Sequence, residues 1–384
     1  RLHRFGKTAL ATLTLLHCGR ATDDPVVVEG LRFLRRRWRE TMSGHGLEGG
    51  ATYSLSLFLM TIHLLGERRL AAGDAPGRVT RSNPLGLESW ARAAARSVHR
   101  WLLRTRGRDG LYSYPLRLAG ASQAAGWWTS SDLSNTQYAM LGLWAGTLCG
   151  ERVEAGTLEA IAEALLTAQQ TKGRYVRRVT DHDARRKDVD PATAVRDRAR
   201  GFSYRSLSMG VVQPVTGAMT AGGLSSLLIV KALVQDREGI EEGLVARLDR
   251  GIWDSIAWLT LHYDVARNPV GYGGGTIPDA VRRQFEARGD VIDSAGWHAY
   301  YLYALERALV IGGKRFLGAH DWYVEGAALL IDSQAADGSW RDGVRKGRVG
   351  LGRGMDPDPL VDTCFSLLFL ERASLRPRSP LLAR

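Results

Sequence analysis

Ala327-Ala-Leu-Leu-Ile-Asp-Ser-Gln-Ala-Ala-Asp-Gly-Ser-Trp340 decides the fold, because it joins a helical segment to a turn of the form Gln-x-x-Asp-Gly-x-Trp. After a loop comes the apolar segment Val361-Asp-Thr-Cys-Phe-Ser-Leu-Leu-Phe-Leu370. Apolar side chains on nearly every face of a segment indicate a helix that is buried all round. The stretch therefore predicts an amphipathic helix, a turn and a buried helix, and weaker copies of this pattern recur back to the N-terminus.

The copies give a strict alternation of two kinds of helical segment along the chain. Six segments are apolar on most faces, and they cover residues 5–17, 52–65, 134–148, 220–234, 296–310 and 362–370. Five segments are amphipathic, and they cover residues 25–42, 88–105, 156–171, 247–263 and 320–335. Thr52, Thr136 and Thr220 occupy equivalent places and are 84 residues apart. A pair of helices that cannot bury its apolar face alone must stack on its neighbours.

The alternation predicts an all-α fold, an α6/α6 toroid in which six inner helices form a ring and an outer helix lies behind each. We expect residues 1–384 to form this single toroid domain, with a charged insertion at residues 172–200. An open solenoid is the alternative, and the nearly uncharged inner helices favour closure. The sixth outer helix would lie before Arg1, so the chain is expected to be cut from a longer one.

Composition limits the partners. The chain has 52 Lys and Arg against 40 Asp and Glu, a formal net charge of +12. This balance favours anionic partners, unless it is only a solvated basic surface. The three cysteines are widely spaced and predict reduced thiols rather than a disulfide framework. No apolar run has the length of a membrane span and no signal peptide precedes the first helix, so the compartment stays open.

Long connections enter the inner helices, and functional groups concentrate on long loops over a rigid scaffold. The helix N-termini gathered at that face would also favour an anion. An apolar, aromatic cavity with a few polar groups is the usual form of a small-molecule site. The residues expected to line it are Trp127, Trp128, Asn135, Gln137, Tyr272, Trp297, His298, Tyr301 and Thr363.

Three aspartates at this face are the candidate catalytic acids if the protein is an enzyme: Asp132, Asp293 and Asp362. Each also lies where a helix N-cap is wanted, and a capping aspartate contributes about 1 kcal/mol to stability. Capping is therefore the alternative reading of each.

The turn from Gln334 to Trp340 resembles the QW motif of squalene–hopene cyclases, and Val361-Asp-Thr-Cys-Phe-Ser resembles the Asp-x-Cys helix start of protein prenyltransferase β-subunits. Two further stretches look like bacterial proteins with prenyltransferase/squalene oxidase repeats: His320-Asp-Trp-Tyr-x-Glu-Gly-Ala327 and Asp132-x-Ser-Asn-Thr-Gln-Tyr138. The resemblance implies the same α/α toroid and an isoprenoid ligand. It departs at the cyclase acid, because the place of an Asp-x-Asp-Asp-Thr motif reads Pro359-Leu-Val-Asp-Thr.

Zinc is the one metal that the resemblance suggests, since prenyltransferases bind it through Asp, Cys and His. Asp362, Cys364 and His298 are the candidate ligands, although His298 lies upstream where the family places its histidine downstream. A buried thiol and a hydrogen-bonded core histidine are the alternative readings. Otherwise no cofactor is expected.

Three functions remain open. The first is a terpenoid-cyclase-like toroid that binds an isoprenoid or other apolar ligand without the complete acid motif. The second is an active isoprenoid cyclase or prenyltransferase-like enzyme. The third is a carbohydrate-active toroid or a protein-interaction scaffold, since fold alone does not choose among these. A protein or membrane-surface partner is a further alternative, and no specific nucleic-acid binding is expected.

Overall fold

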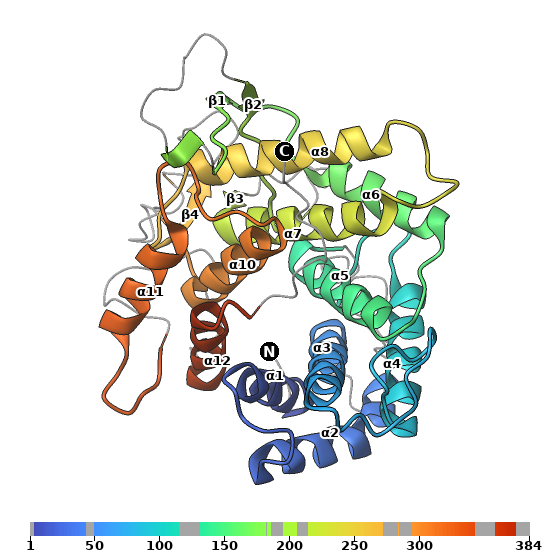
Figure 1. Ribbon diagram of the computed structural model, residues 1–384. Helices are drawn as coiled ribbons and strands as arrows, with labels where there is room; N and C mark the ends of the chain where they lie inside the picture. Colours follow the sequence, from blue (N-terminus) through green and yellow to red (C-terminus); the bar gives the residue numbers. More distant parts are fainter. Residues whose placement is uncertain are drawn as a thin grey trace. The chain divides into compact units, whose positions relative to one another are not determined.

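The computed structural model describes residues 4–43, 50–114, 131–181, 183–185, 195–205, 214–271, 283, 294–341 and 358–373. It confirms that the chain is mostly helical, and each of the eleven predicted helical segments is a helix (Figure 1). The chain divides into two compact units, an N-terminal unit, Arg1–Ile161, and a C-terminal unit, Ala162–Arg384. Each unit is described by itself.

The N-terminal unit is built on three apolar helices that lie side by side, α1 (Arg4–His17), α3 (Ala51–Ala72) and α5 (Leu133–Leu148). The amphipathic helices α2 (Pro25–Ser43) and α4 (Ser89–Thr105) pack against them. Every residue of α5 from Leu133 to Gly146 is buried. The alternation read from the sequence therefore corresponds to buried and partly exposed helices.

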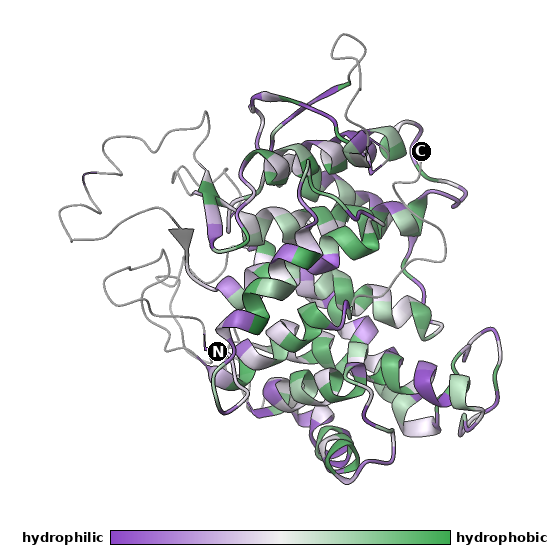
Figure 2. Cartoon of the chain, turned by 60° about the vertical axis from the view of Figure 1, so that its left-hand side comes forward, coloured by the Kyte–Doolittle hydropathy of each residue, from purple (hydrophilic) through white to green (hydrophobic). Residues whose placement is uncertain are grey.

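The C-terminal unit repeats this arrangement. Helix α7 (Gly217–Val234) lies between α8 (Leu244–Leu261) and α10 (His298–Ile311), and α12 (Pro359–Leu370) packs against both α10 and α11 (Trp322–Ser333). Helix α6 (Ala155–Ala168) spans the boundary between the units. Hydrophobic residues concentrate on the helices, which also carry hydrophilic ones on part of their surface (Figure 2).

Among the described residues, only α7 has the length and hydropathy of a membrane span, and it is mostly buried within the protein as a core helix would be. The three cysteines form no disulfide, as predicted; Cys18 is exposed, and Cys149 and Cys364 are buried.

Short strands are present in connections where the sequence predicted none. Strands β1 (Tyr175–Arg177) and β2 (Arg196–Arg198) form an antiparallel ribbon, and β3 (Val215–Thr216), β4 (Asn268–Gly271) and β5 (Ser294–Ala295) form a second antiparallel sheet in that order. The β1–β2 ribbon lies within the charged segment 172–200 and packs against α8. The described parts of that segment therefore contain short strands, which the charged sequence did not predict.

The turn at Gln334 is closed by its own hydrogen bonds. The Ala335 N–H donates to the Ser339 carbonyl at 2.9 Å, and the Gly338 N–H donates to the Ala335 carbonyl at 2.8 Å. The Ser339 N–H donates to Oδ1 of Asp337 at 3.0 Å. Gly338 has φ +79°, a left-handed conformation that glycine adopts without strain. Trp340 then anchors the turn, because its indole Nε1–H donates to the Leu330 carbonyl at 2.8 Å.

The turn at Arg106 has the same bonds, although its sequence is a weak copy. The Gly107 N–H donates to the Leu111 carbonyl, and the Gly110 N–H donates to the Gly107 carbonyl. The Leu111 N–H donates to Oδ1 of Asp109. In both turns the closing aromatic residue donates its backbone N–H to a threonine Oγ1 near the start of the next apolar helix: Tyr112 to Thr136 and Trp340 to Thr363, each at 3.0 Å.

A third copy holds the charged segment inside it. The Phe202 N–H donates to Oγ1 of Thr220 at 3.1 Å, as Tyr112 does to Thr136. The neck of the insertion is closed by Gln170, whose N–H donates to the Gly201 carbonyl and whose Oε1 accepts from the Gly201 N–H, both at 3.0 Å. Two of the three threonines that define the predicted spacing, Thr136 and Thr220, thus accept equivalent hydrogen bonds.

Candidate ligand site at the starts of the apolar helices

Asp132 begins α5 and caps it. Its carboxylate accepts the Asn135 backbone N–H at 2.7 Å through one oxygen and the Asn135 side-chain amide at 2.8 Å through the other. Asp132 is almost completely buried. Asp132 is therefore an N-cap, as the alternative reading had it, and a catalytic role for Asp132 stays a prediction.

Three tyrosines gather next to this helix start, and we call Tyr53, Tyr114 and Tyr138 the tyrosine cluster. The ring of Tyr53 lies 4.9 Å from that of Tyr138 and 5.8 Å from that of Tyr114, measured between centroids. The hydroxyls of Tyr53 and Tyr114 are 3.4 Å apart. Tyr138 is buried, whereas Tyr53 and Tyr114 are half-buried and keep accessible ring surface.

Two predicted polar lining residues lie beside the tyrosine cluster on α5. Asn135 and Gln137 are both buried. Oδ1 of Asn135 has no hydrogen-bond partner within the part of the chain that the structure describes. A buried acceptor without a partner costs free energy unless a ligand or water satisfies it. It is therefore a candidate polar contact for a ligand.

In the C-terminal unit, α10 begins with the predicted residues Trp297, His298 and Tyr301. Trp297 has φ +69° and is 41% exposed. Nε2 of His298 lies 2.8 Å from the Val265 carbonyl, which fits a hydrogen-bonded histidine. Tyr301 is fully buried, and burial together with the charge of Asp264 raises the pKa of its hydroxyl above the usual range. That hydroxyl has no partner among the described residues.

The start of α12 differs from the prediction in its cap. The helix begins at Pro359, so the N-cap position belongs to Asp358, and Asp362 lies buried within the first turn. The capping role expected for Asp362 is wrong, because proline at the first helical position sets the helix start earlier. Thr363 accepts the Trp340 N–H, and Cys364 is buried.

A second aromatic group joins α10 and α12, and we call Tyr300, Tyr303 and Phe365 the α10–α12 cluster. The Phe365 ring centroid lies 5.8 Å from that of Tyr300 and 5.4 Å from that of Tyr303. The guanidinium of Arg307 lies 4.2 Å from the Tyr303 ring centroid and is completely buried. Sequence reasoning missed this cation, although a Glu-Arg pair inside an apolar segment was the available signal.

A further cluster that sequence reasoning missed lies near Tyr301. The rings of Tyr263 and His320 are 4.4 Å apart between centroids, and Nδ1 of His320 lies 3.0 Å from Oε1 of Glu325. Burial and the Glu325 carboxylate raise the pKa of Tyr263. These residues come from separate elements, so no local pattern marked them.

The predicted zinc triad is not assembled by the structure. Within the described ranges no group of three or more His, Cys, Asp or Glu is arranged to hold a metal ion. His298 already faces a backbone carbonyl, as noted above. Four other predicted residues, Trp127, Trp128, Tyr272 and Asp293, lie outside the described residues.

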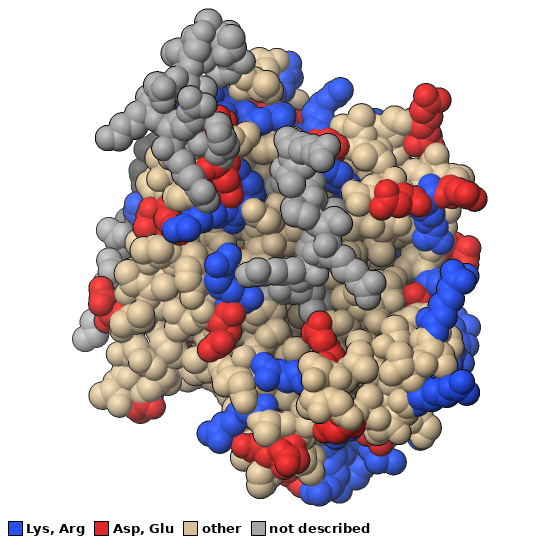
Figure 3. All heavy atoms as spheres, in the orientation of Figure 1, with Lys and Arg blue, Asp and Glu red and all other residues tan. Residues whose placement is uncertain are grey.

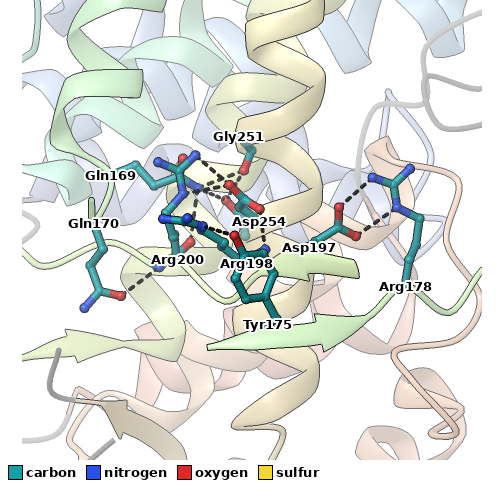
Figure 4. A network of polar contacts seen from close by, with 11 residues as sticks. Gln169, Gln170, Tyr175, Arg178, Asp197, Arg198, Arg200, Gly251 and Asp254 are labelled. Carbon is teal, nitrogen blue, oxygen red and sulfur yellow. Dashed lines mark hydrogen bonds and ion pairs between the residues drawn. The ribbon is translucent and has the colours of Figure 1, made fainter. Parts of the chain in front are cut away.

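The β1–β2 ribbon is fixed to α8 by a network of polar contacts (Figure 4). Buried Asp254 accepts the Arg198 backbone N–H at 2.8 Å and pairs with the Arg200 guanidinium at 2.5 Å. Arg178 forms a bidentate ion pair with Asp197, at 2.6 and 2.8 Å. The Arg178 guanidinium also lies 4.1 Å from the centroid of a Trp253 ring.

Models of known protein families and curated proteins were compared with this chain, and none matches it. The function is therefore inferred from the residues and contacts described above.

Proposed function

We propose that this protein is an α/α toroid of the terpenoid-cyclase type whose apolar helices bind an isoprenoid or another apolar ligand. The repeated turns support the repeat architecture, since three aromatic residues donate to three equivalent threonines. Helices that alternate between buried and amphipathic along the whole chain are what such a ring requires. The ring itself and its central cavity are part of the proposal.

The observation that carries the ligand class is the aromatic clustering near the starts of apolar helices in each unit. The tyrosine cluster and the α10–α12 cluster both place tyrosine rings there, and Tyr53, Tyr114 and Tyr300 are only half-buried. Aromatic faces bind apolar chains by burial and attract positive charge through their quadrupole. Such surfaces suit a polyprenyl chain and, in an enzyme, its cationic intermediates.

The acid chemistry of a class II cyclase has little support in the described residues. Protonation of an alkene needs a strong, supported acid. The motif position carries Pro359-Leu-Val-Asp362-Thr363, which lacks two of the three carboxylates. Asp132 already accepts two hydrogen bonds from Asn135. Binding without cyclisation is therefore the function we place first.

A second candidate, an active isoprenoid enzyme, is favoured by one observation. The Tyr301 hydroxyl is buried and unpartnered within the described part of the chain, and like an ordinary tyrosine it is protonated at neutral pH. A protonated hydroxyl in an apolar setting is a hydrogen-bond donor that a diphosphate or a leaving group would accept. In this case Tyr301→Phe abolishes turnover of farnesyl or geranylgeranyl diphosphate while the fold persists.

Native mass spectrometry with metal analysis of the purified protein tests the first candidate. We expect a co-purifying apolar molecule of defined mass, or uptake of added geranylgeraniol. Tyr53→Leu combined with Tyr138→Leu should reduce uptake, whereas Tyr175→Leu, at a tyrosine 60% exposed on β1, should not. A protein that is bare and takes up no geranylgeraniol overturns the proposal. Stoichiometric zinc would support the enzyme candidate instead.

A further inference from the structure

Two arginines lie directly opposite each other on the outer face of the β1–β2 ribbon. Arg177 on β1 is the register partner of Arg196 on β2. The pairs at the two ends of the ribbon are hydrogen-bonded, since the Ala199 N–H donates to the Arg174 carbonyl and the Arg178 N–H donates to the Val195 carbonyl. Hydrogen-bonded and non-hydrogen-bonded pairs alternate between them. Arg177 and Arg196 therefore form a non-hydrogen-bonded pair, in which the Cα atoms approach to about 4.5 Å and side chains are closest. Like charges directly opposite each other destabilise a ribbon.

Further cations lie on the ribbon and next to it. Lys172, Arg174 and Arg198 are exposed, as is Arg196 of the pair itself. Arg198 donates from Nε to the Tyr175 hydroxyl at 2.9 Å, which does not neutralise its charge.

Two of the acidic side chains that the structure describes on this segment are held in ion pairs: Asp197 pairs with Arg178, and Asp181 pairs with Lys314 at 2.9 Å. Lysine and arginine side chains gather over the region where Figure 1 labels β1 and β2 (Figure 3). The outer face is thus a cationic surface held in place by the Asp254 network.

The edge of β1 offers backbone groups as well. In an antiparallel pair, residues of non-hydrogen-bonded pairs direct their N–H and C=O groups away from the partner strand. Tyr175 and Arg177 are such residues on β1, and the structure records no hydrogen bond to their backbone groups among the residues it describes. An unpaired edge is a template for an added strand.

We propose that this edge and the outer face of the ribbon bind an extended, acidic segment of a partner protein. A strand added to β1 forms backbone hydrogen bonds with Tyr175 and Arg177. Its alternate side chains project to one face, so glutamates or aspartates at every second residue meet Arg177 and Arg196. A nucleic acid offers phosphates for the arginines but no amide ladder for the edge, so the peptide fits both features. The inference is independent of the apolar ligand proposed above.

Binding of a fluorescein-labelled peptide of alternating Glu and Thr, measured by anisotropy, tests this surface. We expect binding that weakens as salt is raised, and no binding of the Lys-Thr counterpart. The double variant Arg177→Gln/Arg196→Gln should bind about tenfold or more weakly, the equivalent of one charge-assisted contact. The matched control Arg100→Gln/Arg104→Gln removes the same charge from exposed positions of α4 and should bind within about twofold of the wild type.

Two further measurements separate this site from general attraction of anions. N-methylation of alternate amides on the peptide removes donors for the β1 edge and should weaken binding about tenfold. Duplex DNA and phosphatidylserine vesicles are added as competitors at equal charge, and we expect neither to displace the peptide. An unbound peptide, equal weakening by the two double variants, tolerance of N-methylation or displacement by DNA or vesicles would each overturn the proposal. Removing a repulsive pair should leave the fold intact, which circular dichroism checks.

Discussion

Trp340 and Thr363 are joined by a hydrogen bond of 3.0 Å from the backbone N–H of the tryptophan to Oγ1 of the threonine. The bond ties the turn after α11 to the beginning of α12 across 23 residues. Because Tyr112 with Thr136 and Phe202 with Thr220 make the same bond, it is a repeated joint between turn and apolar helix.

Replacing Thr363 by valine keeps the side-chain shape and removes the acceptor. The Trp340 N–H then loses its partner, and a buried donor without a partner costs about 1–3 kcal/mol. We expect the free energy of unfolding, measured by urea titration, to fall by that amount. Thr363→Ser retains the hydroxyl and should lose less than half as much. Equal losses for the two variants would assign the effect to packing rather than to the bond.

Gly223 on α7 should not tolerate a larger side chain. A Cβ atom built there would lie 2.4 Å from Cδ2 of Phe202, the aromatic residue that closes the third turn. Overpacking of this kind costs about 1–3 kcal/mol, so Gly223→Ala should lower the melting temperature. Gly156 on α6 has no neighbouring atom within 4 Å of the same position. Gly156→Ala should therefore stabilise the protein by up to about 1 kcal/mol. A neutral Gly223→Ala would contradict the packing described.

Acidification should destabilise the N-terminal unit. Burial lowers the pKa of His63 and of His99 from 6.5 to about 4. Between these values the unfolded chain binds protons that the folded chain does not, so stability is present above pH 6.5 and is lost as the pH falls toward 4. The loss is on the order of 3 kcal/mol for each histidine. The urea midpoint should fall between pH 7 and pH 5, and less so in His63→Gln. Identical midpoints at the two pH values would contradict this prediction.

Asp254 should contribute far more to the free energy of unfolding than Asp249, which lies on the same helix. Asp254→Asn leaves the Arg200 guanidinium without its counterion in a largely buried place, which costs about 3 kcal/mol. Asp249 pairs with Lys231, but its side chain is 40% exposed, so Asp249→Asn should cost under about 1 kcal/mol. Urea titration compares the two, and limited proteolysis should cut the ribbon faster only in Asp254→Asn. A similar response of both variants would contradict a special role for the network.

The helices were predictable because the local pattern of apolar residues indicates which helices are buried. Segments with little charge became buried helices, and the cap at Asp132 followed from an acidic residue before an apolar run. The cap of α12 was misplaced because the proline at Pro359, which starts the helix, was given less weight than Asp362. Local patterns of this kind placed the helix starts to within a turn, whereas α3 ends at Ala72, well beyond the predicted end at residue 65.

The site contacts were less predictable because they join distant residues. Tyr53 and Tyr114 meet across 61 positions, and Arg198 reaches Asp254 across 56. The strands of the ribbon are three residues long and strongly charged, so no alternation of apolar residues marked them. The ribbon is held by contacts with Asp254 on α8, and the sequence of the ribbon alone does not reveal those contacts.

Gln170 and Gly201 join the two ends of the charged segment through two hydrogen bonds. The Phe202–Thr220 bond next to them therefore does not depend on how many residues lie between Gln170 and Gly201. The length of the chain between the two can therefore change over generations, provided that Arg198 and Arg200 are kept to contact Asp254 on α8. An engineer could graft a foreign peptide here under the same condition.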